Sequence, residues 1–98
     1  MEIREFQELM RQIYYRRDQQ RGVAGTFVWF AEEVGELAKA IRRGAQENCA
    51  EEFSDVLAWL TSLANLMAVD LEQTVGKYKN GCPRCGKTPC QCEQRPLP

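Results

Sequence analysis

The sequence contains no histidine among its 98 residues. This absence excludes ferritin-like di-iron sites, which need a Glu-x-x-His pair, and also zincin-type and Ser-His-Asp hydrolases. It removes histidine as a general base as well. Acid–base chemistry in this chain would have to come from other side chains.

Long apolar runs and a strong charge of one sign are also missing. No run approaches the roughly 18 apolar residues that a membrane helix needs. The first segment, MEIREFQELMRQ, is charged from its start and lacks the apolar core of a secretory signal, so we expect a cytoplasmic protein. With 13 basic and 14 acidic residues, the net charge of −1 gives no electrostatic case for binding duplex nucleic acid or an anionic membrane.

The apolar residues recur at three- and four-residue spacing, and no segment alternates with period two for long enough to form a sheet. Gly22 and Gly25 interrupt the first helical stretch, and Thr26 is the predicted N-cap of the next. Gly44 stands where a helix-ending glycine belongs, and Asp70 is a good N-cap. The prediction is an all-α bundle of about four helices, over residues 3–21, 27–43, 47–69 and 70–80.

The chain divides into a helical domain, residues 1–80, and a cysteine-rich tail, residues 81–98. A domain of this size is close to the limit at which a single core is stable alone. We therefore expect the bundle to be completed by oligomerisation, as a homodimer or homotetramer.

Two acidic motifs are the most informative feature: Glu32-Glu33-x-x-Glu36 and Glu52-x-x-Asp55. Residues three apart share one helix face, where like charges repel unless a cation lies between them. Exposed acidic faces are common, but Glu52 falls within the apolar sector of its helix, where an unpaired charge is costly. Oxygen ligands of this kind suit Mg²⁺ or Mn²⁺, and such ions usually serve phosphate chemistry.

Two tryptophans share the helix faces of these carboxylates. By the angular count of about 100° per residue, Trp29 lies beside Glu33 and Trp59 lies between Glu52 and Asp55. Either ring could stack on a nucleobase. Packing in the core is the commoner fate of a tryptophan in a bundle.

At these residues the sequence resembles the MazG-like nucleoside triphosphate pyrophosphohydrolases of the short single-domain type. FVWFAEEVGELAKAIRRG (27–44) and EEFSDVLAWLTSLANLMAVDLEQTVGKYKN (51–80) carry the family's EExxE…ExxD pattern in full. The resemblance implies the all-α NTP pyrophosphatase fold and a helical oligomer. It also implies Mg²⁺-dependent hydrolysis of nucleoside triphosphates, including dNTPs or non-standard NTPs, to monophosphate and pyrophosphate.

The resemblance also implies roles for individual residues. Glu33, Glu36, Glu52 and Asp55 would bind Mg²⁺. Glu32 would be a further ligand or would orient the attacking water. Two residues match a lysine and an asparagine that touch phosphates in the family, namely Lys77 and Asn80; for Lys77 the alternative is a favourable charge at a helix C-terminus.

The tail contains four of the five cysteines within eleven residues, as Cys82-Pro-Arg-Cys85-Gly and Cys90-Gln-Cys92. Four thiolates in a tetrahedral array suit a structural Zn²⁺ ion, with no open position for catalysis. An unliganded or redox-active tail is the alternative. Cys49 falls on an apolar stripe and is predicted to be a core residue.

Two other functions are compatible with the sequence. One is a non-catalytic helical module whose zinc knuckle binds nucleic acid or a protein, although few basic residues flank the cysteines. The other is a phosphoribosyl-ATP pyrophosphatase, which would share the helical fold and the carboxylates. The absence of histidine and the match to the short MazG-like pattern favour the nucleoside triphosphate pyrophosphohydrolase.

Overall fold

The computed structural model describes residues 1–44 and 46–93, and within these ranges it contains helices and turns but no strand. The elements follow in the order α1 (Ile3–Arg43), α2 (Gln46–Leu66), α3 (Leu71–Val75) and the short 3-10 helix η1 (Gly76–Tyr78). The all-α prediction is confirmed. The number of helices differs from the prediction because the first two predicted helices form one kinked helix.

The kink in α1 lies at Gly22, whose φ of 82° and ψ of 170° are non-helical. A positive φ of this kind is readily adopted by glycine, which has no Cβ. The predicted N-cap at Thr26 is wrong, because the helix has already resumed before it. The Thr26 side chain is instead fully buried, and its hydroxyl accepts a hydrogen bond of 3.1 Å from Arg21 Nη1.

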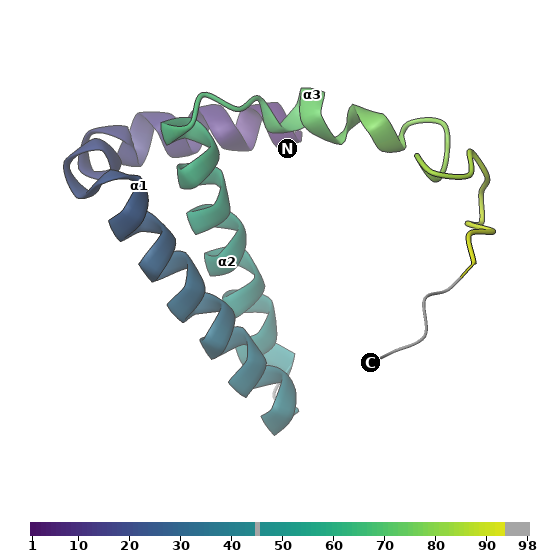
Figure 1. The fold of residues 1–98 in the computed structure, drawn as a ribbon. Coiled ribbons are helices and arrows are strands. Elements are labelled where there is room, and N and C mark those ends of the chain that lie inside the picture. Colours follow the sequence, from purple (N-terminus) through teal and green to yellow (C-terminus); the bar gives the residue numbers. More distant parts are fainter. Residues whose placement is uncertain (45, 94–98) are drawn as a thin grey trace.

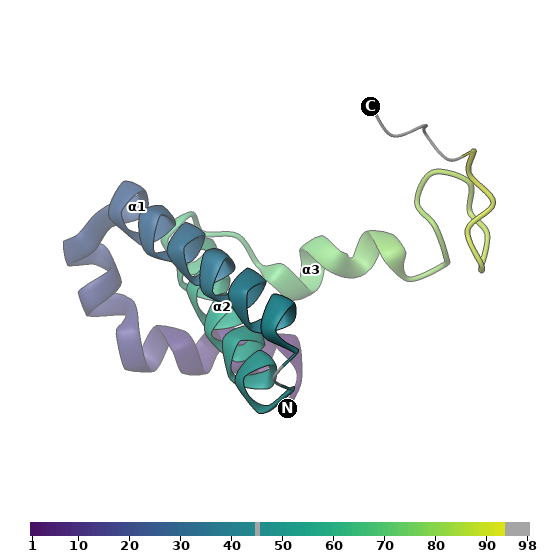
Figure 2. The same cartoon turned by 90° about the horizontal axis from the view of Figure 1, so that it is seen from below.

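We call the part of α1 before Gly22 its first arm and the part after Gly22 its second arm. The second arm and the whole of α2 form a helical hairpin, in which the two helices lie side by side in both views (Figures 1 and 2). Gly44 ends α1 in the left-handed conformation, with φ of 72°. Its N–H donates to the carbonyls of Ala40 and Ile41, as expected for a helix-ending glycine. The hairpin turn therefore lies where the sequence predicted it.

A buried amide pair fastens the first arm of α1 to the end of α2. Gln7 Nε2 donates to Asn65 Oδ1 at 3.0 Å and to the carbonyl of Val69 at 2.7 Å, and Gln7 Oε1 accepts from Leu71 N–H at 3.0 Å. Asn65 Nδ2 returns a bond of 3.2 Å to the Gln7 carbonyl. Because both polar atoms of the Gln7 side chain are hydrogen-bonded, its burial carries little desolvation penalty. The hydrogen bonds therefore fix the position of the first arm of α1 against the end of α2.

The helix α2 ends at Leu66, three residues earlier than predicted. Ala68 has a φ of 57°, and Val69 N–H reaches back to the Ala64 carbonyl at 2.9 Å, so the backbone turns out of the helix here. The predicted cap at Asp70 is confirmed, since its side chain accepts from Gln73 N–H. The last predicted helix is shorter than expected, because it gives way to the 3-10 turn at Gly76.

The chain buries few of its large apolar side chains. Each arm of the hairpin has a row of half-exposed apolar residues at seven-residue spacing, which we call the heptad rows: Phe27, Val34 and Ile41 on α1, and Phe53, Leu60 and Met67 on α2. Phe27 is 55% and Phe53 is 58% exposed. One copy of the chain therefore leaves its helical stripes largely uncovered.

Among the described residues, no helix is both long enough and apolar enough to cross a lipid bilayer.

Candidate active site

The hairpin brings three of the predicted carboxylates together. Glu33 on α1 and Glu52 and Asp55 on α2 each offer an oxygen, and these atoms all lie within 4.8 Å of one another. All three side chains are half-buried. We call this group the carboxylate cluster; it forms because the two antiparallel helices place their acidic motifs face to face.

The negative charges of the carboxylate cluster repel one another when no cation lies between them. Burial raises the pKa of Glu33, and the negative charges of Asp55 and Glu52 raise it further. Glu52 Oε2 is buried and has no hydrogen-bond partner among the described residues. A buried acceptor without a donor is costly, and a cation placed among these oxygens would satisfy it and cancel the repulsion.

The other two acidic residues of the first motif lie at the edge of this arrangement. Glu36 is half-exposed and pairs with Lys39 at 3.6 Å, although its charge still contributes to the raised pKa of Glu33. Glu32 is exposed. Neither contributes an oxygen to the carboxylate cluster as the structure stands.

The two tryptophans meet beside the cluster and link α1 to α2. Their rings stack with centroids 6.1 Å apart and an interplanar angle of 16°. The Arg21 guanidinium lies 4.7 Å from the centre of the Trp59 ring, within the range of a cation–π contact. Trp29 remains 47% exposed, so the pair is a partly open aromatic surface at the side of the carboxylates.

A cavity of about 320 Å³ opens next to the carboxylate cluster, between the first arm of α1 and α2. Asp55 and Trp59 border it, so it is continuous with the features described above. Its wall is a mixture of cationic, anionic and aromatic side chains, contributed by Tyr14, Arg17, Asp18, Arg21, Asp55, Ala58, Trp59 and Ser62.

Asp18 is the residue in this cavity that sequence reasoning missed. It is only 1% exposed, and its Oδ1 accepts a hydrogen bond of 3.0 Å from Arg21 Nη1. Its Oδ2 is buried and has no partner among the described residues. The spacing in the sequence could have indicated this position. Asp18 follows Met10 and Tyr14 at four-residue steps, so the three residues share one face of the helix.

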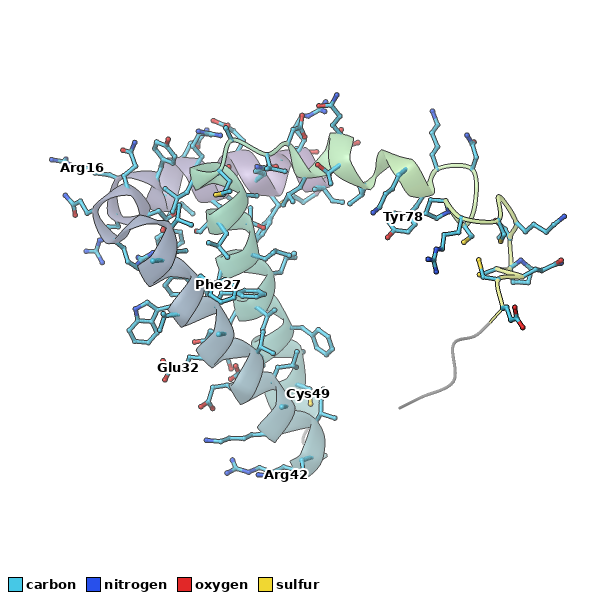
Figure 3. All side chains as sticks on the ribbon, in the orientation of Figure 1. Arg16, Phe27, Glu32, Arg42, Cys49 and Tyr78 are labelled. Atoms are coloured by element: carbon cyan, nitrogen blue, oxygen red, sulfur yellow. The ribbon has the colours of Figure 1, made fainter. Side chains whose placement is uncertain are left out.

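Lys77 and Asn80 do not lie near the carboxylates of their own chain. Figures 1 and 3 show that α3 and the residues after it extend away from the hairpin, with Tyr78 far from Glu32. The Lys77 ammonium instead lies 5.1 Å from the centre of the Tyr78 ring. Within one copy of the chain, these two residues therefore lie apart from the carboxylate cluster.

The four tail cysteines form a second group of possible metal ligands, because the sulfurs of Cys82, Cys85, Cys90 and Cys92 all lie within 4.8 Å of one another. Backbone N–H groups of Cys85 and Arg84 point at the Cys82 sulfur and lower the pKa of its thiol to about 6. Hydrogen bonds with Cys90 and Cys82 raise the pKa of Cys92 to about 12. The structure thus brings together all four cysteines of the predicted zinc knuckle, while Cys49 lies apart in α2.

The described residues form an all-helical hairpin that gathers carboxylates from two helices, a set of oxygen ligands that could hold a metal ion. The comparison with known families makes the assignment specific, since the family model for the MazG nucleotide pyrophosphohydrolase domain matches residues 21–85. This chain belongs to the MazG nucleotide pyrophosphohydrolase family. The matched range contains both acidic motifs and ends within the cysteine group. No curated protein matches the chain closely enough to name a relative.

Proposed function

We propose that this protein hydrolyses nucleoside triphosphates between the α- and β-phosphates, releasing nucleoside monophosphate and pyrophosphate, with Mg²⁺ or Mn²⁺ as its cofactor. The observation that carries the proposal is the carboxylate cluster, three acidic groups within 4.8 Å that include a buried and unpartnered Glu52 oxygen. The family assignment supports the reaction class.

The chemistry of the cluster fits a hard divalent cation. Glu33, Glu52 and Asp55 would bind it through oxygen, and Glu36 is the fourth ligand we propose. The exposed pair between Glu36 and Lys39 is weak enough to be exchanged for a metal contact. When bound, Mg²⁺ would neutralise phosphate charge and acidify a water molecule. Glu32, next to Glu33, is the group we propose to orient the attacking water.

The cavity beside Asp55 is the proposed position of the nucleoside. Trp59, which stacks on Trp29, borders the cavity with aromatic surface, which suits a base of any kind. Asp18 Oδ2 is a buried acceptor without a donor, so we propose that it receives an N–H group of the base. Arg17 provides positive charge at the same wall. The proposed substrates are dNTPs or non-standard NTPs that present such a donor.

A second copy of the chain would complete both the fold and the site. The heptad rows leave apolar side chains such as Phe27 and Phe53 in water, and covering each of these would contribute about 1.5–3 kcal/mol. We propose a homodimer or homotetramer in which these rows are covered. In that assembly Lys77 and Asn80 of one copy would be available to the phosphates bound by its partner.

We also propose that residues 1–80 are the catalytic domain and that residues 81–98 are an appended tail, of which 94–98 lie outside the described residues. The domain boundary is supported by the projection of the tail away from the hairpin (Figure 2).

The test is product analysis with each (d)NTP and with phosphoribosyl-ATP, in the presence of Mg²⁺ or Mn²⁺ and in ¹⁸O-labelled water. Monophosphate plus pyrophosphate is the expected product pair, and the position of ¹⁸O identifies the attacked phosphorus. Glu52→Gln should abolish turnover, while Glu51→Gln, a matched change at an exposed position of α2, should not. Release of nucleoside diphosphate plus inorganic phosphate would overturn the proposed reaction. A preference for phosphoribosyl-ATP would overturn it as well. Absence of turnover with every substrate would leave the non-catalytic zinc-binding module as the better account.

A further inference from the structure

The cysteine tail is the largest feature that pyrophosphohydrolysis leaves without a role. It projects from the end of η1, away from the hairpin, and its sulfur atoms gather at one place (Figure 3). None of the described tail residues is fully buried. A segment with so little buried apolar surface gains almost nothing from the hydrophobic effect, so its fold needs another source of stability.

The backbone of the tail already has the shape of a ligand loop. Gly86 N–H donates to the Cys82 carbonyl at 2.7 Å, and Cys82 N–H donates to the Lys87 carbonyl at 3.1 Å. Gly86 follows Cys85 with φ of 73°, a conformation that glycine adopts without strain. These two bonds close the loop, so the first two cysteine side chains point to the same side.

The second pair of cysteines returns to meet the first. Cys82 Sγ and Cys92 Sγ are 3.6 Å apart, and Gln91 N–H donates to Cys85 Sγ at 3.4 Å. A regular tetrahedron of thiolates around zinc, with Zn–S of about 2.3 Å, has sulfur–sulfur edges of about 3.8 Å. The observed packing of four sulfurs within 4.8 Å is close to this geometry.

We propose that Cys82, Cys85, Cys90 and Cys92 bind one Zn²⁺ ion as a closed four-thiolate site that stabilises the fold of the tail. On binding, the sulfurs lose their remaining protons to solvent, and no oxidation or reduction takes place. With all four positions filled by sulfur, the ion has no open position for water, so its role is structural. The proposal is independent of the reaction performed at the carboxylate cluster.

The first test is metal analysis of the full-length chain purified under reducing conditions, with Cys49→Ser as the matched control. Cys49 is a free thiol in α2, outside the tail group. Wild type and Cys49→Ser should each contain one zinc per chain, and Cys82→Ser/Cys85→Ser should contain almost none. Replacement by Co²⁺ should give thiolate-to-metal charge-transfer bands and the visible bands of tetrahedral cobalt in wild type and in Cys49→Ser, but not in the double variant.

A second test reports on the tail rather than on the metal. Arg84 and Lys87 are exposed tryptic sites inside the loop. Trypsin should cut at these residues slowly in the zinc-loaded protein, and at least about tenfold faster after a chelator removes zinc, because ligation and folding are coupled. Adding Zn²⁺ back should restore protection. Far-UV circular dichroism of the double variant should show an intact helical domain.

Three outcomes would overturn the proposal. One is a reduced wild-type tail that neither contains zinc nor takes it up in competition with a chelator. Another is disulfide formation among the tail cysteines in the native protein, detected by mass before and after reduction. The third is iron in place of zinc, since a tetrahedral thiolate site can bind either metal.

Discussion

The hairpin and the tail of this protein each gather ligand atoms within 4.8 Å, but they do so by different means. The carboxylate cluster joins Glu33 to Asp55 across two helices, whose positions are set by the Gly44 turn. The tail draws its four sulfurs from eleven consecutive residues that form no helix. In the hairpin two packed helices bring like charges together, whereas the tail holds its sulfurs on a short loop with few buried side chains.

This difference corresponds to different uses of an ion. Oxygen ligands on a preformed scaffold suit Mg²⁺, which keeps several waters and can share them with a phosphate. Sulfur ligands that enclose an ion on all sides leave no position for a substrate. The first proposed site would therefore suit an exchangeable ion, and the second would suit a permanent ion.

The largest expected effect is on turnover at the carboxylate cluster. Asp55→Asn removes a charge that would hold the metal, and several kcal/mol of transition-state stabilisation should be lost with it, so kcat/KM should fall by about 10³-fold or more. Pyrophosphate release at saturating Mg²⁺ measures this. Cys82→Ser should lower the same quantity by less than about tenfold. Equal losses in both variants would show that the two sites act as one.

The next effect concerns the surface of the hairpin. Phe53→Glu places a charge in a heptad row, and in a symmetric interface the change occurs twice. Losing about 1.5–3 kcal/mol for each phenylalanine should raise the dissociation constant of the dimer by about 10²-fold or more. Light scattering after size-exclusion chromatography should then show monomers, while Phe53→Leu stays associated. A wild type that is monomeric at every concentration would contradict the proposed assembly.

The third effect is on thermal stability. A site that is loaded at about 100 times its Kd should stabilise the fold by about 2.7 kcal/mol, or roughly 10 °C or more in Tm for a domain of this size. Mg²⁺ should produce this shift in wild type but not in Glu33→Gln. Removal of zinc should change the melting of the helical domain by no more than about 2 °C. A large zinc effect on that transition would show that the tail supports the hairpin.

The smallest effect is on the pH dependence of the metal-free protein. The folded-state pKa of Glu33 is raised above 4.5, so its contribution to stability is present at low pH and is lost as the pH rises through the raised value. In a chelator, Glu33→Gln should therefore melt above wild type near neutral pH. The difference should shrink as the pH is lowered toward 4.5, and scanning fluorimetry over this range measures it. A difference that stays constant with pH would contradict the repulsion between Glu33 and its neighbours.

Local sequence signals predicted much of the fold. The break at Gly22, the end of α1 at Gly44 and the cap at Asp70 follow from conformational preferences and hydrogen bonds within a few residues. The misplaced cap at Thr26 shows the limit of this reasoning. Threonine is a good N-cap, but here its hydroxyl accepts from Arg21 in a buried contact that no local rule specifies.

The amino-acid sequence alone specifies the class of ligand in each group, because hard oxygens and soft sulfurs select different ions wherever they are placed. It also determined which residues share a helix face, since a helix has a fixed period. The three-dimensional fold, by contrast, brings Glu33, Glu52 and Asp55 together while Glu36 pairs with Lys39. It alone placed an unpartnered Asp18 oxygen beside them and left the heptad rows open. Such outcomes depend on how two helices and a kinked arm pack, and packing is set by the whole chain rather than by neighbours in sequence.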